Sequence, residues 1–194
     1  MTLTKRTLFI IILILSLQSW AKADSISDFQ IERISIGDSL LSHISKEEIN
    51  KIKSPNKKLK IVRTRIKDNL DQYKYVQLWW FDQDIEYRIV GISGELIFDN
   101  DLEGCKKKQK EIANSVKKTL KDFNIKQSQN NYSDDLSGNS KVYHHAFKFE
   151  NGDNINVQCY MFSKNYKEKN NLIDNLKVMI VTKEMDEHFR EAYK

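Results

Sequence analysis

The chain has 194 residues, of which 40% are hydrophobic and 30% charged, a length and composition that suit one domain with a sizeable core. The formal net charge is +5, but Lys5, Arg6 and Lys22 contribute three of the positive charges, and residues 24–194 hold 29 positive and 27 negative side chains, a net charge of +2. So small an excess, spread over lysine-rich surfaces, excludes a typical nucleic-acid-binding protein.

The first 23 residues have the pattern of a secretory signal peptide. Lys5 and Arg6 precede an apolar run over residues 8–17, and Ala21-Lys22-Ala23 supplies small residues at the cleavage position. The run is shorter than the roughly 20 apolar residues that span a bilayer. We therefore expect a signal peptide over residues 1–23 and a single periplasmic or secreted domain over 24–194, with no transmembrane span after cleavage.

Residues Gly37-Asp38-Ser39-Leu40 match the four-letter signature of the GDSL esterases and lipases, in which the serine is the nucleophile. In that family an Asp-x-x-His segment near the C-terminus supplies the base and the residue that orients it. Here the positions three residues before the four histidines are Leu40, Lys141, Val142 and Met185. We interpret the four letters as a chance match, with Asp38 or Ser39 capping a short helix, and keep an esterase that uses Ser39 as an alternative hypothesis.

The rest of the first half indicates short elements. Residues 45–48 (SKEE) form a capping box that opens a second short helix, Pro55 ends it, and residues 59–67 alternate as a strand. This order of short helices and strands resembles the small SmpA/OmlA-like modules of outer-membrane assembly. The residues that carry the resemblance are Ile31, Ile34, Ile36, Gly37, Ser39 and Leu40. The resemblance implies a non-catalytic binding or scaffold domain with an envelope partner.

Two strands and a long helix follow, and the remaining elements are organised around them. Residues 75–81 and 85–92 are predicted strands, with a bend at Gly91 and Gly94 before residues 96–98. Residues 102–123 repeat apolar side chains at helical spacing, with lysines on the remaining circumference. Residues 126–140 are a predicted polar loop, 176–182 a final strand, and the chain ends in a short helix with a docking stripe of Met185, Phe189 and Tyr193.

The two cysteines, Cys105 and Cys159, are expected to form a disulfide. An even pair in an exported chain is typical of a disulfide, and Cys105 lies on the apolar stripe of the predicted helix. The chain has no CxxC spacing, so a redox-active role is not indicated.

Asn151-Gly152 predicts a two-residue type I′ turn between strands over 141–150 and 153–162. That turn places Val142 opposite Met161 and His144 opposite Cys159, on the face toward the helix. The other face then forms an aromatic surface that binds a protein, peptide or lipid, or that a terminal helix covers. Its residues are Trp79, Phe81, Tyr143, Phe147, Phe149 and Tyr160.

We expect neither a metal site nor a cofactor, because His144 and His145 are neighbours on a strand and point to opposite sides. The predicted fold is α+β: a mainly antiparallel sheet of about six strands, packed on one long helix, with short helices at both ends. The predicted function is a non-enzymatic binding or scaffold module of the cell envelope. A secreted inhibitor or effector that binds another protein is the third hypothesis.

Overall fold

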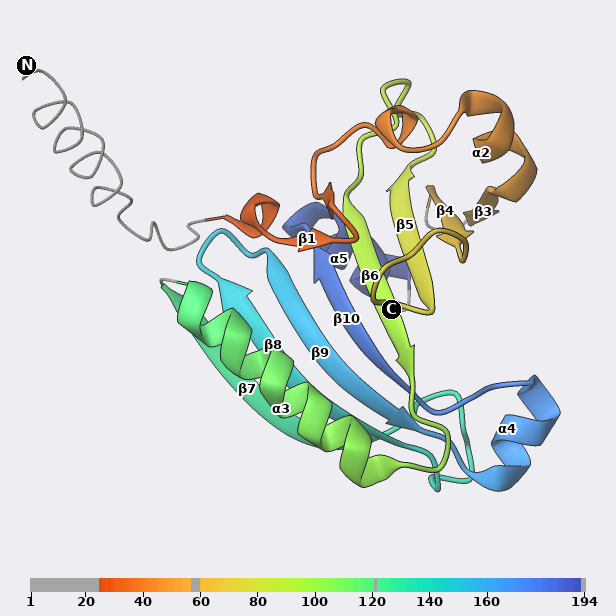
Figure 1. The fold of residues 1–194 in the computed structure, drawn as a ribbon, viewed down its shortest axis with the longest axis vertical. Helices are drawn as coiled ribbons and strands as arrows, with labels where there is room; N and C mark the ends of the chain where they lie inside the picture. The colour runs from red at the N-terminus through yellow and green to blue at the C-terminus, as the bar shows by residue number, and fades with distance from the viewer. Residues whose placement is uncertain (1–24, 57–59, 121, 193–194) are drawn as a thin grey trace, which may run out of the picture.

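The computed structural model describes residues 25–56, 60–120 and 122–192. These residues form an α+β fold around one eight-stranded antiparallel sheet with the order β3-β4-β5-β6-β10-β9-β8-β7 (Figure 1). The predicted signal peptide lies outside the described residues. The strands are β3 (Ser54–Asn56), β4 (Ile61–Ile66), β5 (Tyr75–Phe81), β6 (Gly91–Ile97), β7 (Phe123–Asn131), β8 (Lys141–Phe149), β9 (Asn154–Met161) and β10 (Asn175–Val181).

Four α-helices and a small N-terminal hairpin surround the sheet in the described part of the chain. The helices are α2 (Lys46–Ile52), α3 (Leu102–Thr119), α4 (Lys164–Asn170) and α5 (Lys183–Ala192). The hairpin pairs β1 (Gln30–Ile31) with β2 (Ile34–Ser35), and two 3₁₀ turns flank it, η1 (Ile26–Asp28) and η2 (Leu40–Ser42).

The prediction of about six strands was too low. The two additional strands, β3 and β7, are the edges of the sheet and have mostly exposed side chains, so hydrophobic alternation does not mark them. Residues 126–140 were predicted to be a loop, yet the first part of this range belongs to β7, which pairs with β8 over nine positions. The strand predicted over residues 85–92 begins too early, because Ile85 lies in a loop, 87% exposed, and β6 begins only at Gly91. The predicted bend at Gly91 and Gly94 is absent, since β6 pairs with β10 without a break from Gly91 to Ile97.

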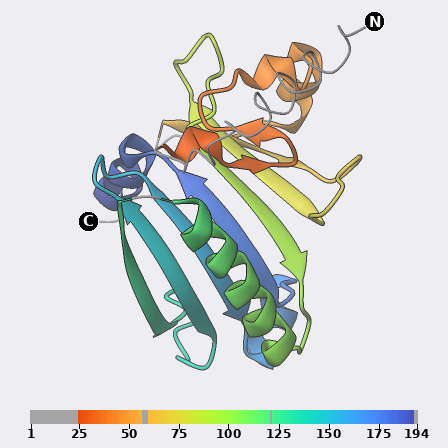
Figure 2. The ribbon, with the colours of Figure 1, turned by 60° about the vertical axis from the view of Figure 1, so that its left-hand side comes forward.

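The sheet has two differently covered faces. On one face, Val76, Leu78 and Trp80 of β5 belong to a large core that includes apolar residues of the N-terminal hairpin and of α3. On the other face, Trp79 and Val181 form a small cluster with Met185 of α5. Two segments therefore cover the larger core: α3 packs mainly on β8, β9 and β10, and the N-terminal segment covers the first strands (Figures 1 and 2).

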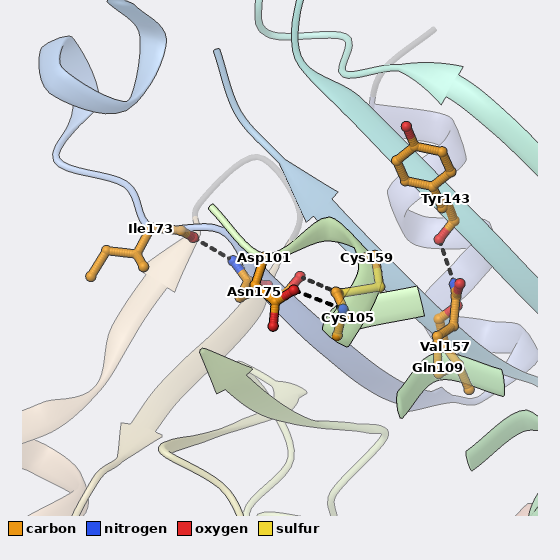
Figure 3. The surroundings of a disulfide bond; sticks show 9 residues. Asp101, Cys105, Gln109, Tyr143, Val157, Cys159, Ile173 and Asn175 are labelled. Atoms are coloured by element: carbon orange, nitrogen blue, oxygen red, sulfur yellow. Dashed lines mark hydrogen bonds between the residues drawn. A yellow bond between two sulfur atoms is a disulfide. The ribbon is translucent and has the colours of Figure 1, made fainter. Parts of the chain in front are cut away.

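Cys105 of α3 and Cys159 of β9 form the predicted disulfide, with their Cα atoms 6.0 Å apart (Figure 3). One turn further along the helix, the buried side-chain amide of Gln109 donates hydrogen bonds to the backbone oxygens of Tyr143 and Val157, both at 2.7 Å. The N-terminus of α3 is capped by Asp101, whose Oδ1 accepts from the backbone N–H of Gly104. These contacts hold α3 along β8 and β9.

The β8–β9 hairpin has a three-residue loop, not the predicted two-residue turn. Phe149 N donates to Asp153 O and Gly152 N donates to Phe149 O, and Gly152 has a φ of +94°. This is a type I turn followed by a glycine bulge. The pairing is therefore shifted by one residue, so that Tyr143 lies opposite Cys159 and Lys141 opposite Met161.

Candidate functional site

The shifted register separates the aromatic residues that were predicted to form one surface. A shift by one position turns each side chain of a strand to the opposite face of the sheet. Phe147 and Phe149 are consequently buried in the core beneath α3, with Tyr143 on the same face. Tyr160 lies on the opposite face, in contact with the rings of Tyr132 and Phe162.

The other two predicted members of the aromatic surface, Trp79 and Phe81, lie against α5. Trp79 packs with Met185, and the ring of Phe81 lies 4.9 Å from that of His188. The six aromatic residues therefore do not form a common exposed surface, and covering by the C-terminal helix accounts for two of them.

Ser39 occupies a capping position. Its hydroxyl donates to the backbone oxygen of Glu86 at 2.7 Å and accepts from the backbone N–H of Leu41. His43 instead lies 3.3 Å from a carboxylate oxygen of Asp38. Within the described ranges Ser39 thus has the hydrogen bonds of a helix cap, and no histidine is hydrogen-bonded to it.

A groove lies between α3 and the last two strands of the sheet, β8 and β7. Its cavity volume is about 570 Å³, and it is lined by Lys106, Gln109, Lys110, Asn114, Lys117, Gln127, Ser128, Gln129, Tyr143, His144 and His145. The lining contains three lysines and four side-chain amides but no carboxylate. Such a surface favours an anionic ligand that also accepts hydrogen bonds.

The three lysines face the groove because of their positions in the helix. Cys105, Gln109 and Val116 point to the sheet and are buried. Lys106, Lys110 and Lys117 each follow one of these buried residues by a single position, so they lie along the flank of α3 that faces β7. The disulfide and Gln109 therefore determine where the lysines lie.

The positive charge of the groove is not neutralised within the described part of the chain. No carboxylate there forms an ion pair with Lys106, Lys110 or Lys117, and Lys106 Nζ lies 4.3 Å from the centroid of the Tyr143 ring. Burial, together with the charge of Lys117, lowers the pKa of His145. Among the described residues, its Nδ1 is one of four buried side-chain N or O atoms without a hydrogen-bond partner.

The opposite face of the sheet also contains charged residues, but these neutralise one another. Glu95 is 7% exposed, and its Oε1 accepts from Gln77 at 2.9 Å and lies 3.1 Å from Lys177 Nζ. His144 also borders the groove, but its side chain points to this face, where its Nδ1 lies 2.8 Å from the amide of Gln158. The groove therefore differs from this cluster in that its lining contains lysines but no carboxylate.

Comparison of the chain with models of known protein families, with curated proteins and with solved structures found no match. The groove itself is therefore the basis for any functional assignment. No group of three or more metal-ligating side chains occurs in the described ranges, and no helix there is long and apolar enough to cross a membrane.

The sequence contained a signal for this site that its interpretation missed. The lysines of residues 102–123 were assigned to a solvated helix face, although three of them recur directly after buried positions. What could not be seen was β7, because the wall that turns an exposed flank of α3 into a groove is a polar strand.

Proposed function

We propose that this chain is an exported, non-enzymatic binding module that holds an anionic partner in the groove between α3 and β7. The observation that supports this function is the set of three groove lysines without a carboxylate partner in the described residues. A binding module in the envelope or outside the cell agrees with the hypothesis of a scaffold, and also with that of an inhibitor or effector.

Export is supported by two independent features. The first 23 residues have the charged start, apolar run and small residues of a signal peptide. The Cys105–Cys159 disulfide is consistent with an oxidising compartment, since structural disulfides persist mainly outside the cytosol.

Titration calorimetry of residues 24–194 with dextran sulfate tests the binding site, with neutral dextran as the blank. Changing Lys106, Lys110 and Lys117 together to Gln removes the charge that faces the groove. We expect this variant to bind dextran sulfate roughly tenfold more weakly or worse, since each exposed charge pair contributes about 0.2–1 kcal/mol.

The matched control changes Lys107, Lys118 and Lys148 to Gln, which removes the same charge from exposed positions outside the groove. It should weaken binding much less, and raising the ionic strength should weaken binding of the native protein. Equal effects of the two triple variants would show that dextran sulfate responds only to overall charge and would exclude the groove as the site.

A further inference from the structure

One wall of the groove is β7, which is an edge strand of the sheet that the described residues form. It has nine residues, pairs with β8, and stands last in the strand order (Figure 2). The opposite edge, β3, has only three residues and contains Pro55, which cannot donate a ladder hydrogen bond. Of the two edges, only β7 is long enough to template another strand.

The hydrogen bonding identifies which backbone groups of β7 point outward. Just beyond the strand, Tyr132 N donates to Ser140 O, which continues the register of β7 with β8. In an antiparallel pair, alternate residues direct both backbone groups to the partner strand. The even-numbered residues of β7 therefore bond to β8, and Ile125, Gln127 and Gln129 present their N–H and C=O groups to solvent.

Natural edge strands are commonly protected by charges, prolines or bulges. Between Phe123 and Asn131, β7 has a single charged residue, Lys126, and no proline. Its register with β8 is unbroken over nine pairs, so no bulge bends it away. The edge is therefore open to an incoming strand.

The lysines of α3 indicate what kind of strand would fit. An added strand lies about 4.8 Å beyond β7, and every second side chain points to the face on which α3 lies. Successive side chains on that face are about 6.7 Å apart. Lys106 and Lys110, four helical residues apart, are separated by about 6 Å along the helix axis. Carboxylates at alternate positions of the added strand would thus match the spacing of Lys106 and Lys110, whereas Lys117 lies about 10.5 Å beyond Lys110, between two such positions.

We propose that an acidic, extended segment of another protein adds to β7 as a ninth strand, with alternate carboxylates facing Lys106 and Lys110 and with its remaining negative charge near Lys117. This rests on the proposed function and specifies its partner as a peptide segment. A second copy of this chain fits less well, because β7 contains no carboxylate and two-fold pairing would bring two unneutralised lysine rows together.

The decisive measurement is amide hydrogen exchange by NMR, with a nine-residue peptide of alternating Glu and Thr, blocked at both ends. In the free protein the amides of Lys126, Ser128 and Asn130 should exchange slowly and those of Ile125, Gln127 and Gln129 rapidly. Adding the peptide should protect the second set. An alternating Lys and Thr peptide, with the opposite charge, should protect neither set further.

Two substitutions at one position separate the backbone from the side chain. Gln127→Pro removes an outward N–H without removing a bond to β8, whereas Gln127→Ala retains that N–H. We expect the proline variant to bind the acidic peptide about tenfold more weakly than the alanine variant, because both lack the glutamine side chain and only the proline variant lacks the N–H. If the proline variant unfolds, the exchange pattern of the native protein decides alone.

The outcomes distinguish this inference from the proposed function. If the acidic peptide and dextran sulfate bind through the three lysines but Ile125, Gln127 and Gln129 stay unprotected, strand addition is wrong and the anionic groove stands. If those amides are already protected in the free protein and sedimentation shows a dimer, the occupant is a second copy and the inference fails. If the lysine substitutions affect no anionic probe, both proposals fail.

Discussion

The buried side-chain amide of Gln109 donates a hydrogen bond to the backbone oxygen of Val157 at 2.7 Å and thereby joins α3 to β9 (Figure 3). The same nitrogen donates to Tyr143 O on β8, also at 2.7 Å. One polar side chain, 3% exposed, therefore sets the position of the helix relative to two strands. The groove on the neighbouring flank of α3 depends on that position.

Replacing Gln109 by Leu should destabilise the protein. The substitution removes both hydrogen bonds and places a branched apolar group against two buried carbonyl oxygens, and we expect a loss of about 1–3 kcal/mol in the free energy of unfolding. Urea denaturation followed by circular dichroism measures it. Gln129→Leu, at an exposed position of the same groove, is the control and should change stability by less than about 0.5 kcal/mol. Equal urea concentrations at the unfolding midpoint for the two variants would contradict the structural role of Gln109.

Removing the disulfide by changing Cys105 and Cys159 to Ala should cost about 4 kcal/mol, the chain-entropy value for a loop of this length. Denaturation of the oxidised and double-mutant proteins gives the difference. Maleimide labelling of the denatured, unreduced protein tests the compartment, because both cysteines are buried in the fold. Both should be unreactive in the full chain after export and reactive when residues 1–23 are deleted. Two free thiols in exported protein would be inconsistent with the fold.

Asp135 should make stability depend on pH. Hydrogen bonds from Ser140, and next from Ser137, hold the pKa of its carboxyl well below the usual range of aspartate. Because the folded-state pKa is lowered, the stabilisation is present above the unfolded-state pKa of about 3.9 and is lost as the pH falls below it.

Asp135→Asn should therefore lower the melting temperature at pH 7 and lower it less at pH 3, which thermal unfolding across this range measures. Asp134→Asn, an exposed neighbour, is the control. If Asp135→Asn lowers the melting temperature by the same amount at pH 7 and at pH 3, the carboxylate charge is not the source of the stabilisation.

Ser39 should behave as a helix cap and not as a nucleophile, because its hydroxyl hydrogen is donated to Glu86 O. A fluorophosphonate probe should leave the native protein unlabelled, and Ser39→Ala should lower the free energy of unfolding by about 0.5–2 kcal/mol. Labelling that disappears in Ser39→Ala would restore the esterase hypothesis.

The elements predicted best are those with a strong period and a buried face. The strand over 75–81 agrees with β5, and the last strand agrees with β10 within one residue at each end. The long helix begins at residue 102 as predicted, but α3 ends at Thr119, and Phe123, predicted on the helical stripe, begins β7. The disulfide followed from the cysteine on the helical stripe. In each case the local hydrophobic pattern and the burial in the fold agree.

The register of the β8–β9 hairpin was not predictable from the turn letters alone. Asn-Gly favours a two-residue turn, but only Gly152 has positive φ, and Asn151 instead accepts from Asp153 N through its side chain. Asp153 Oδ1 also accepts from Lys183 N at the start of α5, a contact between distant parts of the chain. The resulting loop has one more residue, and the aromatic face therefore turned inward.

By itself the sequence determined the α+β class, the helix with its lysine flank, and the pairing of the two cysteines, because periodicity and covalent chemistry act locally. Only the tertiary structure decided that β7 becomes a strand and that three lysines face a groove. The physical reason is that β7 is held in the sheet by backbone hydrogen bonds to β8. Such bonds can form with almost any side chains, so the polar sequence of β7 does not show that it is a strand.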